Sequence, residues 1–177
     1  MSNSLSLDGK TIVIVGAAGR LGRDLVSGAF EVGANVVALD SNSAELQKLC
    51  EAYPSSSRFM SASIDIADSK AISNVFDLVD AKFGALDGAV NTAYPRNPNY
   101  GRKFFEVEYQ DFCENLSMHL GGYFLFMQQC AKYSKIRQRK FSLVNLSSIY
   151  GVMAPRFDIY DGTTMTMPVE YAAIKAG

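Results

Sequence analysis

The chain has 177 residues, of which 48% are hydrophobic and 20% charged, and its formal net charge is -1 at pH 7. This balance is ordinary for one globular domain; it argues against a nucleic-acid-binding surface, and no segment is apolar enough to span a membrane. The three cysteines are too widely spaced for a zinc site or a disulfide framework, so we expect a single cytoplasmic domain over 1–177 with no metal, nucleic-acid or membrane partner.

Apolar runs rich in β-branched residues alternate with helical patterns along the chain. The expected strands cover residues 11–15, 35–40, 58–63, 86–91 and 141–146. The expected helices cover residues 20–32, 42–52, 68–83 and 108–134, and a further helix opens at residue 170. Asn42 or Ser43 is expected to cap the second helix, Gly84 to end the third, and Gly121-Gly122 to interrupt the fourth.

This alternation predicts an α/β fold, namely a Rossmann-type doubly wound parallel sheet in a three-layer α/β/α arrangement. Residues 92–107 and 149–169 are expected to be long loops. Both follow the carboxyl end of a strand, which is where ligands bind in open sheets of this kind.

The segment between the first strand and the first helix carries Gly16, Gly19 and Gly22. Glycines allow a tight turn and let the backbone approach a pyrophosphate, which the N-terminus of a helix favours electrostatically. We therefore expect Gly16, Arg20, Leu21 and Gly22 to contact a dinucleotide.

Asp40 ends the second strand and Ser41 follows it, and both are expected to contact the cofactor. A carboxylate there can bind the ribose hydroxyls of adenosine and repel a 2′-phosphate, which favours NAD. Arg20 argues in the other direction, because a guanidinium near the loop could meet a 2′-phosphate or the pyrophosphate. NAD is the expected cofactor, and NADP stays open.

Two further strand ends could line the same site. Asp65-Ile66 follow the third strand, where the carboxylate could meet the adenine amino group or simply cap the next helix. Asn91, Thr92 and Ala93 follow the fourth strand and offer small residues where the backbone could pass close to the nicotinamide half.

Tyr171 and Lys175 are four residues apart near the end of the chain, so on a helix they share one face. A lysine ammonium held near a tyrosine favours the phenolate, which makes the phenol a usable proton donor and acceptor. Such a pair is often just a solvated helix face. The pair indicates a catalytic role here because the chain also carries the glycine turn and Ser147-Ser148, which follow an apolar strand.

Taken together, these motifs resemble the short-chain dehydrogenase/reductase family over almost the whole chain. The resemblance implies a nicotinamide-dependent oxidoreductase. Tyr171 would be the acid/base, Lys175 would bind the nicotinamide ribose and tune that tyrosine, and Ser148 would hydrogen-bond the substrate oxygen. Ser147 would be structural. The motifs that carry the resemblance are Gly16–Gly22, Asp40, Asp65-Ile66, Asn91-Thr92-Ala93, Leu120–Phe124, Asn145–Gly151 and Tyr171–Lys175.

The chain departs from the family pattern at several positions. Gly16 and Gly19 are separated by two residues rather than three, which looks more like the family's extended members. His119 aligns where the family usually carries an asparagine that holds a water in a proton relay, and Asn115 lies one helical turn earlier. A histidine there could relay protons as well, or it could be a core histidine bonded to backbone.

The loop between Ser148 and Tyr171 is longer than the family's usual spacing. With the segment that begins at Tyr94, it looks like members associated with bacterial surface-polysaccharide and flagellin-modification pathways. Family members also continue past Lys175 with further strands, so the sheet is expected to be C-terminally incomplete. An exposed sheet edge would then make this span marginally stable or self-associating.

The expected reaction is the interconversion of a small-molecule alcohol and a carbonyl compound, with a substrate that could be sugar-derived. Arg96, Arg102 and Arg156 could meet an anionic group on it, although solvated loop charges are the simpler interpretation. The resemblance makes a homodimer or homotetramer the expected assembly. Two rival functions are a non-catalytic dinucleotide-binding sensor or scaffold, and a structural subunit that docks partner copies through residues 108–134.

Overall fold

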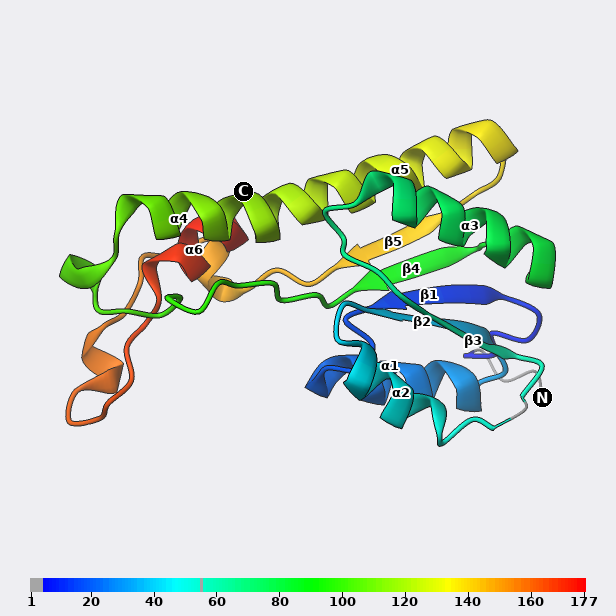
Figure 1. Cartoon of the computed structure of the whole chain (residues 1–177), viewed down its shortest axis with the longest axis horizontal. Coiled ribbons are helices and arrows are strands. Elements are labelled where there is room, and N and C mark those ends of the chain that lie inside the picture. Colours follow the sequence, from blue (N-terminus) through cyan, green and yellow to red (C-terminus); the bar gives the residue numbers. More distant parts are fainter. Residues whose placement is uncertain (1–4, 55) are drawn as a thin grey trace. The chain divides into compact units, whose positions relative to one another are not determined.

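The computed structural model describes residues 5–54 and 56–177, and within them five strands form one parallel sheet in the order β3-β2-β1-β4-β5 (Figure 1). Strand β1 pairs with two neighbours, so that Val13 lies opposite Val37 on one side and Ala89 on the other. This confirms the expected doubly wound sheet. The strands are β1 (Thr11–Val15), β2 (Asn35–Asp40), β3 (Phe59–Ser63), β4 (Gly88–Asn91) and β5 (Ser142–Asn145).

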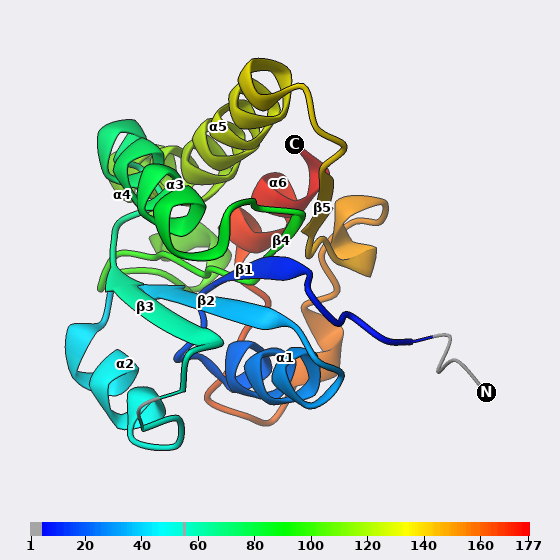
Figure 2. The same cartoon turned by 90° about the vertical axis from the view of Figure 1, so that its right-hand side faces the viewer.

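Helices cover both faces of the sheet and make the expected three layers. Helices α1 (Arg20–Glu31) and α2 (Ser43–Cys50) lie on one face, as Figure 2 shows, while α3 (Ser69–Phe83) lies on the other. The later part of α5 (Gly122–Arg137) lies beside α3, where the rings of Phe76 and Phe126 have centroids 6.2 Å apart. Both faces of β1 are therefore buried, which accounts for its continuous apolar sequence.

The core beneath α1 and α2 is built from small and branched apolar side chains. Val26 of α1 and Leu46 of α2 pack against strand residues that include Ile14, Val36 and Phe59. Burying such side chains contributes roughly 1.5–3 kcal/mol each, which fixes both helices against the sheet. The glycine turn before α1 is held by the same packing, because Ala17 and Ala18 belong to this cluster.

Side chains at the helix ends set the start of α2 and α3. The Asn42 side chain accepts a hydrogen bond from the backbone N–H of Glu45, which selects Asn42 over Ser43 as the cap. Asp68 caps α3 by accepting from two backbone N–H groups, and Gly84 ends that helix at a φ of 79°. The predicted stop at Gly84 is confirmed.

Strands β4 and β5 are shorter than the expected 86–91 and 141–146. Leu86 lies outside β4, and its backbone N–H donates to the Tyr133 hydroxyl at 2.9 Å. Asp87 lies just before β4, where its backbone still bonds to Thr11 and Ser142 and its carboxylate accepts from the backbone N–H of Thr11 at 2.9 Å.

The chain divides into two compact units. One holds the sheet and comprises the chain up to Ala93 together with Leu125–Asn145. The other comprises Tyr94–Phe124 and Leu146–Gly177, with helices α4 (Tyr109–Leu116) and α6 (Val169–Ala176). The expected single domain stays a prediction. Across the described residues, no helix combines the length and the apolar character needed to cross a membrane.

The expected long helix over 108–134 is broken earlier than its glycine pair suggests. A π-helical turn, Ser117–Gly121, separates α4 from α5. Single π turns inside helices are common at functional sites because they displace one side chain from the regular helical face. The turn here contains His119.

Candidate active site

The turn between β1 and α1 has no room for side chains at two of its glycines. Gly16 has a φ of 75°, and a Cβ there would lie 2.8 Å from Thr92 Oγ1 and 2.9 Å from the Ala93 nitrogen. A Cβ at Gly22 would collide with the Gly16 carbonyl oxygen. Both positions therefore require glycine, and the turn brings backbone rather than side chains to the carboxyl end of the sheet.

Helix α1 begins at Arg20 with Gly19 as its N-cap, and no side chain of the described chain caps it. Its first turn also lacks acidic residues. The backbone N–H groups of Arg20, Leu21 and Gly22 consequently lack intrahelical acceptors and suit an anion. Arg20 is exposed beside them. The chemistry of this turn fits the pyrophosphate of a dinucleotide.

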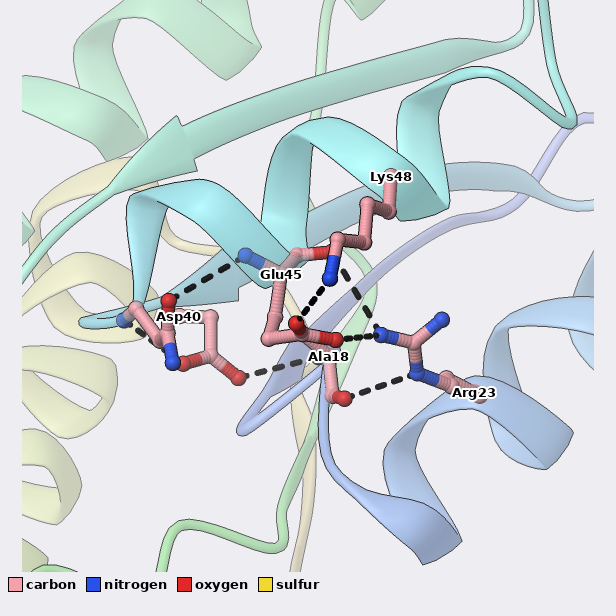
Figure 3. A network of polar contacts seen from close by, with 6 residues as sticks. Ala18, Arg23, Asp40, Glu45 and Lys48 are labelled. Carbon is pink, nitrogen blue, oxygen red and sulfur yellow. Dashed lines mark hydrogen bonds and ion pairs between the residues drawn. The ribbon is translucent and has the colours of Figure 1, made fainter.

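Asp40 is held at the carboxyl end of β2 by two backbone N–H groups, as Figure 3 shows. Ala18 donates to Oδ2 and Asn42 donates to Oδ1, each at 2.9 Å. Each carboxylate oxygen keeps a free lone pair, so Asp40 can still accept from ribose hydroxyls. The carboxylate is thus oriented by the same turn that would bind the pyrophosphate.

Arg23 also positions the glycine turn, and the sequence reasoning missed it. Its Nε donates to the Ala18 carbonyl at 2.8 Å, and its Nη2 donates to Glu45 at 2.8 Å (Figure 3). Glu45 is also bonded to Lys48, and this bond lowers the pKa of the Glu45 carboxyl. The available signal was the arginine's place one turn into α1, opposite a glutamate in the first turn of α2.

The other expected cofactor residues take different positions at the strand ends. Thr92 Oγ1 donates to the Val15 carbonyl at 2.7 Å, which joins the ends of β1 and β4. Asn91 is buried, and its Oδ1 accepts from the Ala93 N–H at 3.1 Å. Ser41 is exposed after β2.

Asp65 and Ile66 follow β3. Asp65 is exposed, and its Oδ1 accepts from the Ala67 N–H at 2.8 Å, which stabilises a turn. The cap of the following helix is Asp68, so the capping alternative for Asp65 is wrong. Ile66 is buried, with 5% of its surface exposed.

The second compact unit contains Tyr171 and Lys175 on α6. The Lys175 ammonium lies 5.8 Å from the Tyr171 ring centroid, so the two residues share a face as their spacing predicts. Lys175 Nζ donates to the Leu146 carbonyl at 2.7 Å and lies 3.5 Å from His119 Nε2. Burial lowers the pKa of this lysine. The ammonium is therefore anchored, with at least one N–H still available.

His119 is almost fully buried, with 1% of its surface exposed. Burial, followed by the nearby Lys175 ammonium, lowers its pKa to about 4. The imidazole is consequently neutral at pH 7, and its Nε2 can accept from Lys175 only if Nδ1 carries the ring proton. Nδ1 has no hydrogen-bond partner in the described part of the chain.

Ser148 and Ser147 follow β5 and have different partners. Ser148 Oγ accepts from the Tyr150 N–H at 3.3 Å, and the Tyr150 ring lies 6.4 Å from that of Tyr171. Ser147 Oγ donates to the Lys175 carbonyl at 3.0 Å, which ties the serine segment to α6. A Cβ at Gly151 would collide with that same carbonyl oxygen, so the two segments are closely packed.

Two residues beside Tyr171 were not among the expected site residues. The ring of Tyr94 lies 5.9 Å from that of Tyr171 and 5.1 Å from that of His119. Glu170 is fully buried, and neither carboxylate oxygen has a hydrogen-bond partner among the described residues. The position of Tyr94 directly after Asn91-Thr92-Ala93 was a usable signal. A glutamate in the first turn of a helix is ordinarily solvated, so nothing marked Glu170.

The loop arginines are mostly engaged by carboxylates. Arg102 pairs with Asp111 at 3.6 Å, and Arg156 Nε donates to Asp158 at 2.7 Å. Arg96 instead places its guanidinium carbon 5.4 Å from the Tyr94 ring centroid. Of the three arginines considered for an anionic substrate group, Arg96 is the one that the described residues leave without a carboxylate.

Comparisons with known proteins agree with this arrangement. A family model described as short chain dehydrogenase matches residues 10–163. The chain is 34% identical over 174 residues to post-translational flagellin modification protein A of Campylobacter coli, covering 97% of this chain and 68% of that protein. It is 31% identical over 151 residues to 2,5-dichloro-2,5-cyclohexadiene-1,4-diol dehydrogenase of Sphingobium indicum, covering 83% of this chain and 57% of that enzyme.

The fold also matches solved structures. A short chain dehydrogenase from Bacillus anthracis superposes with a TM-score of 0.79 at 20% identity, over 96% of this chain and 63% of that one. The chain thus spans about two thirds of the length of the relatives it matches.

Proposed function

Because this chain belongs to the short chain dehydrogenase family, we propose that it interconverts an alcohol and a carbonyl compound by hydride transfer with a nicotinamide dinucleotide. The observation that carries the proposal is the Lys175 ammonium, 5.8 Å from the Tyr171 ring centroid and anchored by the Leu146 carbonyl. Tyr171 would give and take the proton on the substrate oxygen, with Lys175 held on the same face of α6.

Each residue of this cluster has one role in the proposed reaction. Tyr171 transfers the proton on the substrate oxygen, and Ser148 orients that oxygen with its hydroxyl. Lys175 lies beside the tyrosine and offers its remaining N–H to a ribose hydroxyl. His119 Nε2 accepts from Lys175, where the family pattern has an asparagine, and so positions the ammonium.

The glycine turn and the strand ends would hold the cofactor. Gly16 and Gly22 let the turn pack closely against the start of α1, whose N-terminus would receive the pyrophosphate and where Arg20 would add a positive charge. Asp40 would bind the adenosine ribose, which favours NAD. Asp65, Asn91, Thr92 and their neighbours would border the remaining parts. When bound, the dinucleotide supplies or accepts the hydride at the substrate carbon.

A sugar-derived or otherwise polyhydroxylated substrate fits the proposal best. One relative is named for flagellin modification and another for the dehydrogenation of a cyclic diol. The runner-up function is a dinucleotide-binding sensor without turnover, which the altered glycine spacing and His119 favour.

The decisive experiment titrates the full-length protein with NADH and with NADPH, following nicotinamide fluorescence. We expect tighter binding of NADH, and we expect Asp40→Ala to weaken NADH binding about tenfold, because it removes the acceptor for the ribose hydroxyls. Ser43→Ala, at an exposed position at the start of α2, is the matched control. Tighter binding of NADPH would show that Arg20 outweighs Asp40, and binding of neither would refute the dehydrogenase proposal.

Turnover separates the enzyme from the sensor. Tyr171→Phe should lower kcat by about 10²–10⁴-fold, since the acid/base is lost while the ring remains. A Tyr171→Phe protein that performs its cellular role as well as the unaltered protein would favour the sensor.

A further inference from the structure

Tyr94 stands beside the proposed catalytic tyrosine and is open to solvent. Its ring contacts those of Tyr171 and His119, yet 39% of the residue is exposed. The guanidinium of Arg96 lies over the ring. Tyr94 is therefore a solvent-exposed neighbour of Tyr171 that has no assigned role in the proton transfer.

The hydroxyl of Tyr94 is paired with one other hydroxyl. Tyr94 Oη and Tyr100 Oη are 2.5 Å apart, and either can donate. Within the described chain, Tyr94 Oη has no second polar partner. If Tyr100 donates, the Tyr94 proton is left over, and if Tyr94 donates, its lone pairs are left over.

The free hydrogen-bonding capacity of Tyr94 Oη, either a proton or lone pairs, favours one chemical class of ligand. A hydroxyl group both donates and accepts, so it can bond to Tyr94 Oη in either orientation of the pair. A carboxylate or phosphate only accepts and suits one orientation alone. The tyrosine pair is consequently better matched to a neutral hydroxyl group than to an anion.

The segment that carries the pair is held rigidly. The backbone N–H of Asn97 donates to Asn115 Oδ1 at 2.9 Å, and both side chains are buried. The Asn97 amide also donates to Asp111 at 2.8 Å and to Glu114 at 2.7 Å. A loop fixed in this way loses little conformational entropy when it binds a ligand.

The surroundings keep both hydroxyls protonated. Burial raises the pKa of Tyr94 and that of Tyr100, and the buried Glu170 carboxylate contributes to the rise in both cases. Two protonated phenols next to Tyr171 serve as hydrogen-bonding groups and do not compete with it as bases.

We propose that Tyr94, held by Tyr100, hydrogen-bonds a second hydroxyl group of the substrate close to the carbon that reacts at Tyr171. The substrate is then a diol, oxidised to a hydroxyketone, or the reverse. This inference rests on the proposed function and assigns a substrate class to the same site.

The test compares two probes with the full-length protein and NAD: the cis form of vicinal cyclohexanediol, and cyclohexanol. We expect kcat/KM to favour the diol by roughly tenfold or more, and we expect Tyr94→Phe to reduce this preference about tenfold. Tyr100→Phe should reduce the preference for the diol by a smaller factor. The double variant Tyr94→Phe/Tyr100→Phe should show the same preference as Tyr94→Phe alone. Tyr109→Phe, the same change at an exposed position of α4 in the same unit, is the matched control.

The outcomes separate the inference from the function. An unchanged diol preference in Tyr94→Phe, an equal preference for both probes, or cofactor binding without turnover of either probe would overturn the inference. Failure to bind either dinucleotide would instead refute the proposed function. If Tyr94→Phe does not fold, as judged by its thermal unfolding, Tyr100→Phe still decides the question because it leaves Tyr94 in place.

Discussion

At the residue scale, both protonation states of His119 carry a cost. The charged form is disfavoured because the ring is buried 3.5 Å from an ammonium group. The neutral form places a proton on Nδ1, which has no hydrogen-bond partner among the described residues. A neutral imidazole in this position accepts from Lys175 without adding a second positive charge. The family's asparagine would also present a neutral acceptor, so the substitution keeps the polarity of the position while filling more space.

The lowered pKa of His119 makes a prediction about stability. In the unfolded chain the imidazole takes up a proton below about pH 6.5, whereas in the folded protein it does so only near pH 4. Between these values the unfolded state binds more protons, so stability falls as pH falls. Wild type should lose about 1–2 kcal/mol more than His119→Asn between pH values of about 7.5 and 4.5, measured by urea unfolding.

Comparing wild type with His119→Asn isolates the imidazole, because the chain has one histidine and the two proteins share all other titrating groups. Parallel pH dependence of the two proteins would contradict the prediction, and it would mean that the imidazole can be protonated without cost in the folded state.

At the scale of elements, the sequence predicted most where local chemistry and packing agree. Strands β1 and β2 have the expected bounds because each is a continuous buried run, and α3 ends at Gly84 because the left-handed residue there suits glycine. The spacing of Tyr171 and Lys175 also predicted their shared face correctly, because residues four apart lie on one side of a helix. The partner of the Leu86 backbone N–H could not be predicted, since it is Tyr133, a residue far along the chain.

In the candidate site, too, features set by local sequence were predicted and features set by distant contacts were not. His119 was found because of its alignment with a family position, whereas its burial against Lys175 depends on the π-helical turn, which no local pattern indicated. The burial of Glu170 and the pairing of Asn97 with Asn115 arise from tertiary contacts between segments distant in sequence.

The Asn97–Asn115 pair joins the loop after β4 to helix α4, and it gives a prediction at this scale. Asn115 is fully buried and makes two hydrogen bonds with Asn97, of 2.9 and 3.1 Å. Asn115→Ala should lower the free energy of unfolding by about 1–3 kcal/mol, because it leaves the backbone N–H of Asn97 buried and unpaired. Amide hydrogen exchange of residues 94–101 should accelerate.

Lys103→Ala is the matched control, since Lys103 is exposed in the same loop and its side chain does not cap the helical turn that follows. Unaltered exchange over residues 94–101 in Asn115→Ala would show that other contacts fix the loop, and it would remove the rigidity on which the Tyr94 inference depends.

At the scale of the whole molecule, the sheet has two edges in the described chain, β3 and β5. Val144 of β5 has 49% of its surface exposed, and Phe124, Met127 and Ile136 of α5 are exposed as well. An exposed edge strand is a template for pairing with another copy. The homodimer or homotetramer expected from the family resemblance stays a prediction.

The 177-residue chain, expressed by itself, should therefore associate with itself at concentrations on the order of tens of micromolar. Val144→Lys should lower the mass measured by sedimentation, because a charge on an edge strand opposes strand pairing. Leu78→Lys places the same charge on an exposed position of α3, with 56% of the residue exposed in wild type, and should leave association unchanged. A monomeric wild-type chain with one cooperative unfolding transition would contradict the prediction, because β5 would then be a tolerated edge of the sheet.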